Sequence, residues 1–197
     1  MVLLKDKLHG HRLLLASRSP RRRELLAGAG LAFELADSYD VEETYPPGLP
    51  AEEVPGYLAV LKSEAYPHAL GVGDILITAD TVVICGGRIF GKPDGREGAA
   101  AMLAELSGRR HTGVALRAPG RMRSFSVSSD VWFRPLAEEE IAYYVDTFRP
   151  YDKAGSYGIQ EWIGYVAIER IEGSFYNVMG LPVQALYAEL GSFVDTL

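Results

Sequence analysis

The apolar stretch Ile75–Ala79, ILITA, places the strongest restriction on the fold of this chain of 197 residues. A short, continuous apolar run rich in isoleucine and leucine is typical of a strand in the core of a sheet. We expect Thr81–Cys85 to continue in extended form, followed by a hairpin turn at Gly86-Gly87. Such a core strand requires further elements packed against it.

Candidate strands and helices alternate around this run. The hydrophobic patterns predict strands at Arg12–Ala16, Leu31–Ala36, His111–Arg117, Ser124–Phe133 and Tyr165–Ile171, and helices at 20–27, 51–66, 96–106, 136–148 and 181–190. Because hairpins occupy the middle of the chain, this order favours an α/β fold with a mixed twisted sheet and flanking helices. No repeat or Gly/Ser/Pro-rich linker divides the sequence, so we expect a single domain over residues 1–197.

The charge balance and cysteine content restrict the class of protein. Acidic residues outnumber basic ones, 26 to 20, which argues against a general nucleic-acid binder. The single cysteine, Cys85, excludes an intramolecular disulfide and fits a reducing compartment. No segment approaches the ~18 consecutive apolar residues of a membrane helix, and the first apolar runs are too short for a signal peptide. We therefore expect a cytoplasmic protein without a membrane partner.

The segment SRSPRRRELL, residues 17–26, places cations where a helix is expected to begin. Ser19 is expected to be the N-cap and Pro20 the first helical residue. The positive end of the helix dipole makes Arg21–Arg23 unfavourable there unless an anion offsets them. A strand, a tight turn and a helix also present free N–H groups to an anion. The alternative is a solvated, arginine-rich helix face.

Carboxylates are candidates for metal binding or proton transfer. Asp80 follows the apolar run and precedes Thr81, at a position where sheet proteins commonly place ligands. It could bind a divalent metal or act as a general base on water, or it could merely cap a turn. Glu42 and Glu43 add carboxylates in the loop after the second expected strand, where a solvated acidic loop is the alternative.

Further polar residues gather in glycine-containing segments. Lys92 lies between Gly91 and Pro93 in a rigid turn, and Lys62 lies on the second expected helix; in isolation each is an ordinary surface residue. The segment YDKAGSYGIQ ends at Gln160, which offers the donor and acceptor atoms that reading a base edge requires. A structured surface loop is the alternative for this segment, whose other polar residues are Asp152, Lys153 and Ser156.

Six segments in order resemble the motifs of one family: LASRSPRRRELL, YLAVLKSEA, ITADTVV, FGKP, YDKAGSYGIQ and YNVMGLP. They resemble the Maf family of nucleoside triphosphate pyrophosphatases, also named septum formation inhibitors, over about residues 12–190. The resemblance implies an α/β fold related to inosine triphosphate pyrophosphatases, with two lobes around a central cleft, and a homodimer. It also implies hydrolysis of a nucleoside triphosphate to the monophosphate and pyrophosphate with Mg²⁺, Mn²⁺ or Co²⁺.

The resemblance also implies roles for individual residues. Asp80 matches the family's proton acceptor and Glu43 an acidic catalytic position, and we expect both to bind the metal. The positions linked to base choice hold Arg21, Thr81 and Gln160. These residue types resemble those of the subgroup acting on dTTP and UTP, not those of the subgroup acting on 7-methyl-GTP. The expected phosphate-contacting residues are Ser19, Arg22, Lys62 and Lys92, with Lys92 also placed among the catalytic residues.

The sequence departs from the family pattern at two places. Glu161-Trp162 stands where a glycine often follows the glutamine, which puts the shape of the base pocket in question, and Lys62-Ser63 replaces Lys-Ala.

Two alternative functions remain. The first is a non-catalytic nucleotide-binding regulator of cell division. The second is a nucleic-acid-binding module based on the arginine cluster, against which the net charge of −6 argues.

Overall fold

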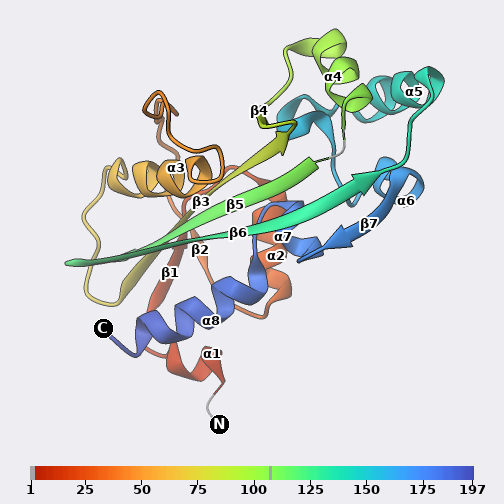
Figure 1. Cartoon of the computed structure of the whole chain (residues 1–197). Helices are drawn as coiled ribbons and strands as arrows, with labels where there is room; N and C mark the ends of the chain where they lie inside the picture. Colours follow the sequence, from red (N-terminus) through yellow and green to blue (C-terminus); the bar gives the residue numbers. More distant parts are fainter. Residues whose placement is uncertain (1–2, 107) are drawn as a thin grey trace. The chain divides into compact units, whose positions relative to one another are not determined.

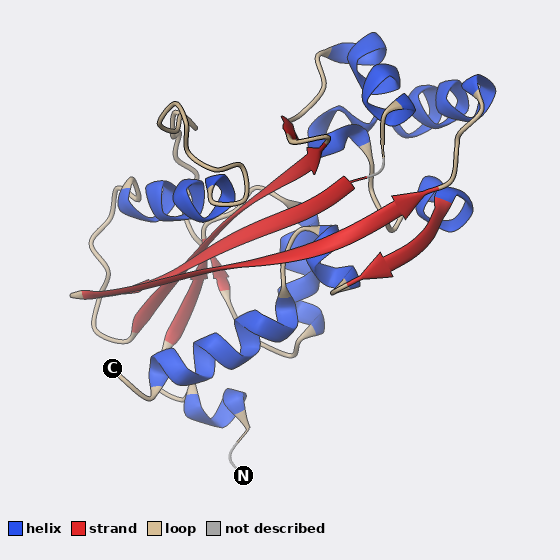
Figure 2. Cartoon of the chain, in the orientation of Figure 1, coloured by secondary structure: helices blue, strands red, loops and turns tan. Residues whose placement is uncertain are grey.

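The computed structural model of the chain describes residues 3–106 and 108–197, and in these residues seven strands form one mixed sheet (Figure 1). The strand order is β2-β1-β3-β5-β6-β7, and β4 pairs with β3 off this path. β1 is parallel to β2 and β3, whereas the β3–β4 and β6–β7 pairs are antiparallel. The expected mixed sheet with flanking helices is therefore confirmed (Figure 2). The strands are β1 (Arg12–Leu15), β2 (Glu34–Leu35), β3 (Asp74–Cys85), β4 (Arg88–Phe90), β5 (Gly108–Ala118), β6 (Arg121–Phe133) and β7 (Ile168–Glu172).

The apolar run at the centre of the sequence forms β3, which is one continuous strand of 12 residues. Its residues 74–80 are all buried, as expected for a strand with neighbours on both faces. Its start pairs with β1 in the register Leu13↔Ile75 and Leu15↔Ile77. Asp80 thus belongs to the strand itself and does not cap a turn after it.

The chain divides into two compact units, and β3 passes from the first to the second between Asp80 and Thr81. Unit 1 comprises Met1–Asp80, Thr112–Val127 and Gly180–Leu197, and unit 2 comprises Thr81–His111 and Ser128–Met179. In unit 1, α1 packs against α8, where Lys7 Nζ lies 2.6 Å from Asp195 (Figure 1). The helices of unit 1 are α1 (Leu4–Lys7), α2 (Pro20–Gly28), α3 (Val54–Glu64) and α8 (Val183–Val194).

Close backbone contact fixes α3 within unit 1. Gly113 of β5 lies so near the start of α3 that a Cβ there would be 2.3 Å from the backbone of Pro55. Thr78 Oγ1 of β3 donates a hydrogen bond of 2.7 Å to the carbonyl of Ala59 on α3. Two strands therefore hold the helix that carries Lys62.

Unit 2 is built around a second apolar cluster. Its core includes Val83, Leu103, Val131, Tyr144 and Tyr157, and α4 packs against α5 (Figure 1). The segment YDKAGSYGIQ, expected as a loop, contains two short 3-10 turns, η1 (Pro150–Asp152) and η2 (Ala154–Ser156). The helices of unit 2 are α4 (Gly95–Ala104), α5 (Glu138–Phe148), α6 (Trp162–Ala167) and α7 (Phe175–Met179).

Two of the expected strands were wrong in part. Residues 165–167, expected in a strand, belong to α6, and β7 begins at Ile168. The Gly164 N–H closes a helical turn on the Glu161 carbonyl, and a Cβ at Gly164 would lie 1.8 Å from the Ile159 carbonyl oxygen. The strand expected at 31–36 is confined to Glu34 and Leu35, both exposed. Such an edge segment lacks the burial that would favour a longer strand.

The first turn of α5 provides a test of stability against pH. Glu140 accepts hydrogen bonds from Arg134 and from the Ala137 N–H, which lower its pKa from 4.5 to about 2. Because the pKa of Glu140 is lower in the folded state, its charge stabilises the fold at pH values above the unfolded-state pKa. This contribution is lost as pH falls toward the folded-state pKa. Glu140→Gln should therefore lower Tm by a constant amount above about pH 5.

The same comparison near pH 2 completes this test. The difference in Tm between wild type and Glu140→Gln should shrink steadily toward pH 2, because Glu140 is then protonated in the unfolded state and half protonated in the folded one. Glu139→Gln is the matched control, since Glu139 is an exposed residue in the same turn. A pH-independent difference in Tm would show that the Glu140 charge is not what stabilises this turn.

Candidate active site

Three charged side chains of unit 1 meet at one point, and we name them the Lys62 cluster: Glu43, Lys62 and Asp80. Lys62 Nζ lies 2.5 Å from Asp80 Oδ1 and 2.9 Å from Glu43 Oε1. The Asp80 side chain is 11% exposed and that of Lys62 16%, whereas Glu43 is half-exposed at 47%. The last turn of α3, the strand β3 and the loop before α3 therefore contribute one residue each.

Tyr39 holds the backbone at Lys62 and was missed by the sequence reasoning. Its hydroxyl donates a hydrogen bond of 2.6 Å to the Lys62 carbonyl. Burial raises the pKa of Tyr39 to about 12, so the hydroxyl remains a protonated donor at neutral pH. No local pattern distinguishes this tyrosine from the others in the chain, because its partner lies 23 residues away.

The Lys62 cluster has the donors and acceptors that phosphate chemistry uses. An ammonium group has three N–H donors, and the two carboxylates occupy two of them. One donor remains for a further acceptor. Both carboxylates turn an oxygen toward the Lys62 ammonium. Carboxylate oxygens of this kind are also donors that a divalent metal accepts. Among the described residues no group of three or more His, Cys, Asp or Glu side chains could hold a metal alone.

Ser63, next to Lys62, provides a second test of stability. Ser63 is fully buried, and its hydroxyl has no hydrogen-bond partner in the part of the chain that the structure describes. Burying an unpaired hydroxyl costs about 1–3 kcal/mol, and alanine is the better helix former. We expect Ser63→Ala to raise Tm by about 2–4 °C in differential scanning calorimetry.

Thr78→Val is the control for this experiment. It also removes a buried hydroxyl, but one that donates to the Ala59 carbonyl, so it should lower Tm. If Ser63→Ala lowered Tm as Thr78→Val does, the Ser63 hydroxyl would have a partner that its surroundings do not indicate.

The start of α2 confirms the predicted helix position, with Pro20 as its first residue. Ser19 occupies the N-cap position, but its side chain makes no capping hydrogen bond. Instead, Ser17 Oγ accepts a hydrogen bond of 3.2 Å from the Ser19 N–H and one of 3.4 Å from Arg22 Nη1. The Ser19 hydroxyl therefore makes no hydrogen bond to the N-terminal N–H groups of α2.

The arginines at this helix start have different surroundings. Arg22 donates to the carbonyls of Ala79, at 2.7 Å, and Gly180, at 2.9 Å, so it lies beside the residue that precedes Asp80. Arg18 contacts Asp40 at 2.7 Å on the following loop. Arg23 is half-buried and donates a hydrogen bond to the Arg18 carbonyl. Arg21 is half-buried in the first turn.

Three expected site residues belong to unit 2: Thr81, Lys92 and Gln160. Thr81 is half-buried and follows Asp80 directly in β3. Lys92 is exposed, and its turn is fixed by a hydrogen bond of 3.0 Å from the Gly155 N–H to the Gly91 carbonyl. This bond joins the FGKP and YDKAGSYGIQ segments. Gln160 Oε1 is buried and has no hydrogen-bond partner among the described residues.

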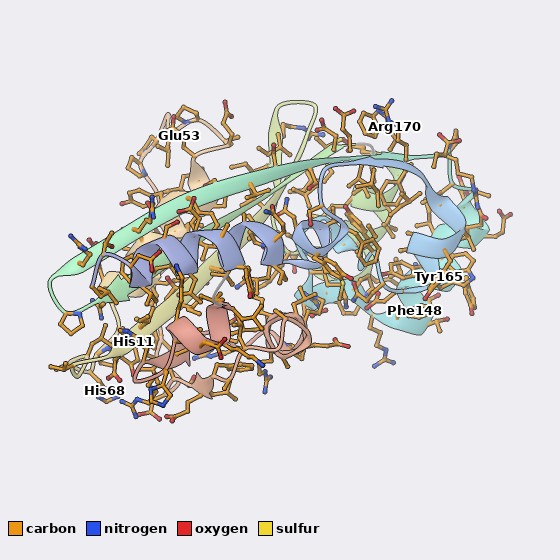
Figure 3. All side chains as sticks on the ribbon, turned by 90° about the horizontal axis from the view of Figure 1, so that it is seen from below. His11, Glu53, His68, Phe148, Tyr165 and Arg170 are labelled. Carbon is orange, nitrogen blue, oxygen red and sulfur yellow. The ribbon has the colours of Figure 1, made fainter. Side chains whose placement is uncertain are left out.

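The structure brings together only part of the expected site. Glu43, Lys62 and Asp80 are in direct contact, and Arg22 joins them through the neighbouring Ala79 carbonyl. Histidines add no metal site: His11 and His68, labelled in Figure 3, take part in no metal-binding group among the residues described. In the described chain no helix is long and apolar enough to cross a membrane.

Proteins use carboxylates, lysines and arginine-rich helix starts to bind and cleave phosphate compounds. Comparison with known families gives the class more narrowly. The family described as Maf-like protein matches residues 12–193. The chain belongs to the Maf family, which confirms the resemblance seen in its motifs.

Relatives match the chain over nearly its whole length. A protein of Porphyromonas gingivalis is 56% identical over 97% of this chain and 98% of its own length. One of Bacteroides thetaiotaomicron is 50% identical, covering 93% and 96%. One of Flavobacterium johnsoniae is 40% identical, covering 98% and 100%. All three are named dTTP/UTP pyrophosphatase.

A solved structure also matches part of the chain. It is a nucleoside-triphosphatase / dITP/XTP pyrophosphatase from Mycobacterium abscessus, 18% identical, with a TM-score of 0.40. The match covers 64% of this chain and 75% of the other. A likeness at this level supports no conclusion about function.

Proposed function

We propose that the chain hydrolyses dTTP and UTP to the nucleoside monophosphates and pyrophosphate. The observation that carries this proposal is the Lys62 cluster, found in a chain up to 56% identical to proteins named for this activity. In this cluster the carboxylate can act as a general base on water and the lysine can bind phosphate oxygens. No observation favours the alternative of a non-catalytic regulator of cell division.

Asp80 is the proposed proton acceptor. Its Oδ1 contacts Lys62, so Oδ2 is the oxygen left to accept a proton from water. The water oxygen forms a bond to the α-phosphorus, and the bond from that phosphorus to the bridging oxygen breaks. Pyrophosphate leaves with the electron pair. The remaining N–H of Lys62, together with Arg22, Lys92 and the first-turn amides after Ser19, would bind the phosphate oxygens.

A divalent cation fits the two carboxylates of the Lys62 cluster. Asp80 and Glu43 would hold it, with Mg²⁺, Mn²⁺ and Co²⁺ as the candidates, because such ions often use one or two protein carboxylates and substrate phosphates. When bound, the metal would offset the charge of the triphosphate. Glu43 is the more exposed of the two and lies on a loop, so it can adjust to the ion.

Base choice is proposed to depend on Arg21, Thr81 and Gln160. The buried, unpartnered Oε1 of Gln160 is an acceptor that lacks a donor within the described residues. Thymine and uracil each carry such a donor at N3. We further propose a homodimer that works in the cytoplasm, and the net charge of −6 supports the absence of a nucleic-acid partner.

A substrate panel tests this function. The purified chain is stripped of metal with EDTA, and pyrophosphate release is measured for dTTP, UTP, dCTP, ATP and GTP with each metal. We expect kcat/KM for dTTP and UTP to exceed that for the others by at least about tenfold, and only with metal. Equal rates on all five would contradict the base choice, and binding without pyrophosphate release would support the regulator.

A further inference from the structure

A buried lysine in unit 2 bridges two carboxylates. The Lys153 side chain is 7% exposed, and its Nζ lies 2.8 Å from Asp152 Oδ1 and 3.1 Å from Glu161 Oε1. A charged group so deeply buried is tolerated only when it is paired. The Glu161 side chain is itself 19% exposed, so the ion pair holds its carboxylate in one place.

The other oxygen of Glu161 extends this contact into α5. Glu161 Oε2 accepts a hydrogen bond from the hydroxyl of Tyr144, whose oxygen accepts one of 3.0 Å from the Gly158 N–H. Tyr144 is fully buried, and its ring stacks on Phe148, labelled in Figure 3, with centroids 5.1 Å apart. Burial and the hydrogen bond to Glu161 raise the pKa of Tyr144, so it stays protonated.

This network ends on the turn that carries Gln160. The Glu161 N–H donates to the Gly158 carbonyl at 2.9 Å, which closes a turn over Ile159 and Gln160. A Cβ at Gly158 would lie 2.8 Å from Gln160 Nε2 and from Glu161 Cδ, so the side chains of the turn fold closely over its backbone. The turn is therefore held at Gly158 by Tyr144 and at Glu161 by Lys153.

We propose that Tyr144, Lys153 and Glu161 are positioning residues. They hold the turn from Gly158 to Glu161 so that Gln160 presents its Oε1 to the N3–H of thymine or uracil. This inference rests on the proposed function. Cytosine carries an acceptor at N3, so a fixed Gln160 disfavours it, whereas a loosened turn lets the amide turn its N–H group to cytosine instead.

The two adjacent tyrosines of α5 provide a matched pair of variants. Tyr144→Phe removes the hydroxyl that links Glu161 to Gly158. Tyr143→Phe makes the same change at a residue that is 50% exposed and whose ring contacts Phe148 and Trp162. We expect the ratio of kcat/KM for dTTP to that for dCTP to fall about tenfold in Tyr144→Phe, and to stay unchanged in Tyr143→Phe.

Glu161→Gln tests the charged part of the network. It keeps an acceptor for the Tyr144 hydroxyl but removes the charge that faces Lys153. We expect a smaller fall in the same ratio, about threefold. This variant also carries the test if Tyr144→Phe does not fold.

The ratio separates positioning from a purely structural role. A loss of stability lowers the folded fraction equally for both substrates, so it leaves the ratio unchanged. If Tyr144→Phe and Glu161→Gln lower Tm or both rates but keep the wild-type ratio, the network only stabilises the fold and the inference is wrong. A wild-type enzyme that does not distinguish dTTP from dCTP would instead contradict the proposed base choice itself.

Discussion

Asp80→Asn should lower kcat for dTTP by ~10²–10⁴-fold, the usual effect of losing a general base. The amide cannot accept the proton of the attacking water, although it can still contact Lys62 at Oδ1. Steady-state kinetics of pyrophosphate release measure this effect. Because asparagine has nearly the same size and shape, the fold should survive the change.

Asp74→Asn is the matched control for that experiment. Asp74 is a buried aspartate at the start of the same strand, where Arg12 hydrogen-bonds to it and lowers its pKa. Its replacement should lower Tm and leave the turnover of each folded molecule unchanged. Near-normal turnover in Asp80→Asn, or an equal loss in Asp74→Asn, would contradict the assignment of Asp80.

Lys62→Met should have the second-largest effect, a loss of ~10²–10³ in kcat. The change removes the ammonium that contacts both Asp80 and Glu43, and leaves two carboxylates facing each other without their counter-charge. Lys62→Arg keeps a positive charge and should retain part of the activity, although its planar group cannot reproduce both contacts. Kinetics with circular dichroism separate lost activity from lost structure.

Lys5 supplies the control for Lys62. It is exposed on α1, so Lys5→Met should leave kcat unchanged. If Lys62→Met retained more than half of the wild-type turnover, Lys62 would serve only to stabilise α3 against β3.

Local patterns in the sequence predicted most of the fold. The apolar run from Ile75 onward was expected to be a core strand, and the hairpin at Gly86-Gly87 joins β3 to β4 in register Cys85↔Arg88. The strand at 165–167 was wrong because β-branched and aromatic residues also fit a short helix. Gly164 also lies so close to the Ile159 carbonyl that a Cβ would not fit there, a steric restriction that a propensity argument does not include.

The sequence predicted which residues belong to the candidate site, but not which of them contact one another. Asp80, Lys62 and Glu43 were expected separately, but their meeting depends on how α3 lies on β3. Ser19 was correctly predicted as the N-cap of α2, although its side chain makes no capping hydrogen bond and Ser17 Oγ accepts one from the Ser19 N–H. Tyr144 gave no signal beyond its place on the apolar face of a helix. Glu161 gave one, because it stands where the family often has glycine.

The fate of the water oxygen shows whether the chain cleaves the bond between the α- and β-phosphates. Hydrolysis of dTTP in water labelled with heavy oxygen, followed by mass spectrometry of both products, reports which phosphorus is attacked. Attack at the α-phosphorus predicts one labelled oxygen in dTMP and none in the pyrophosphate. Label in the pyrophosphate, or release of orthophosphate in its place, would contradict attack at the α-phosphorus.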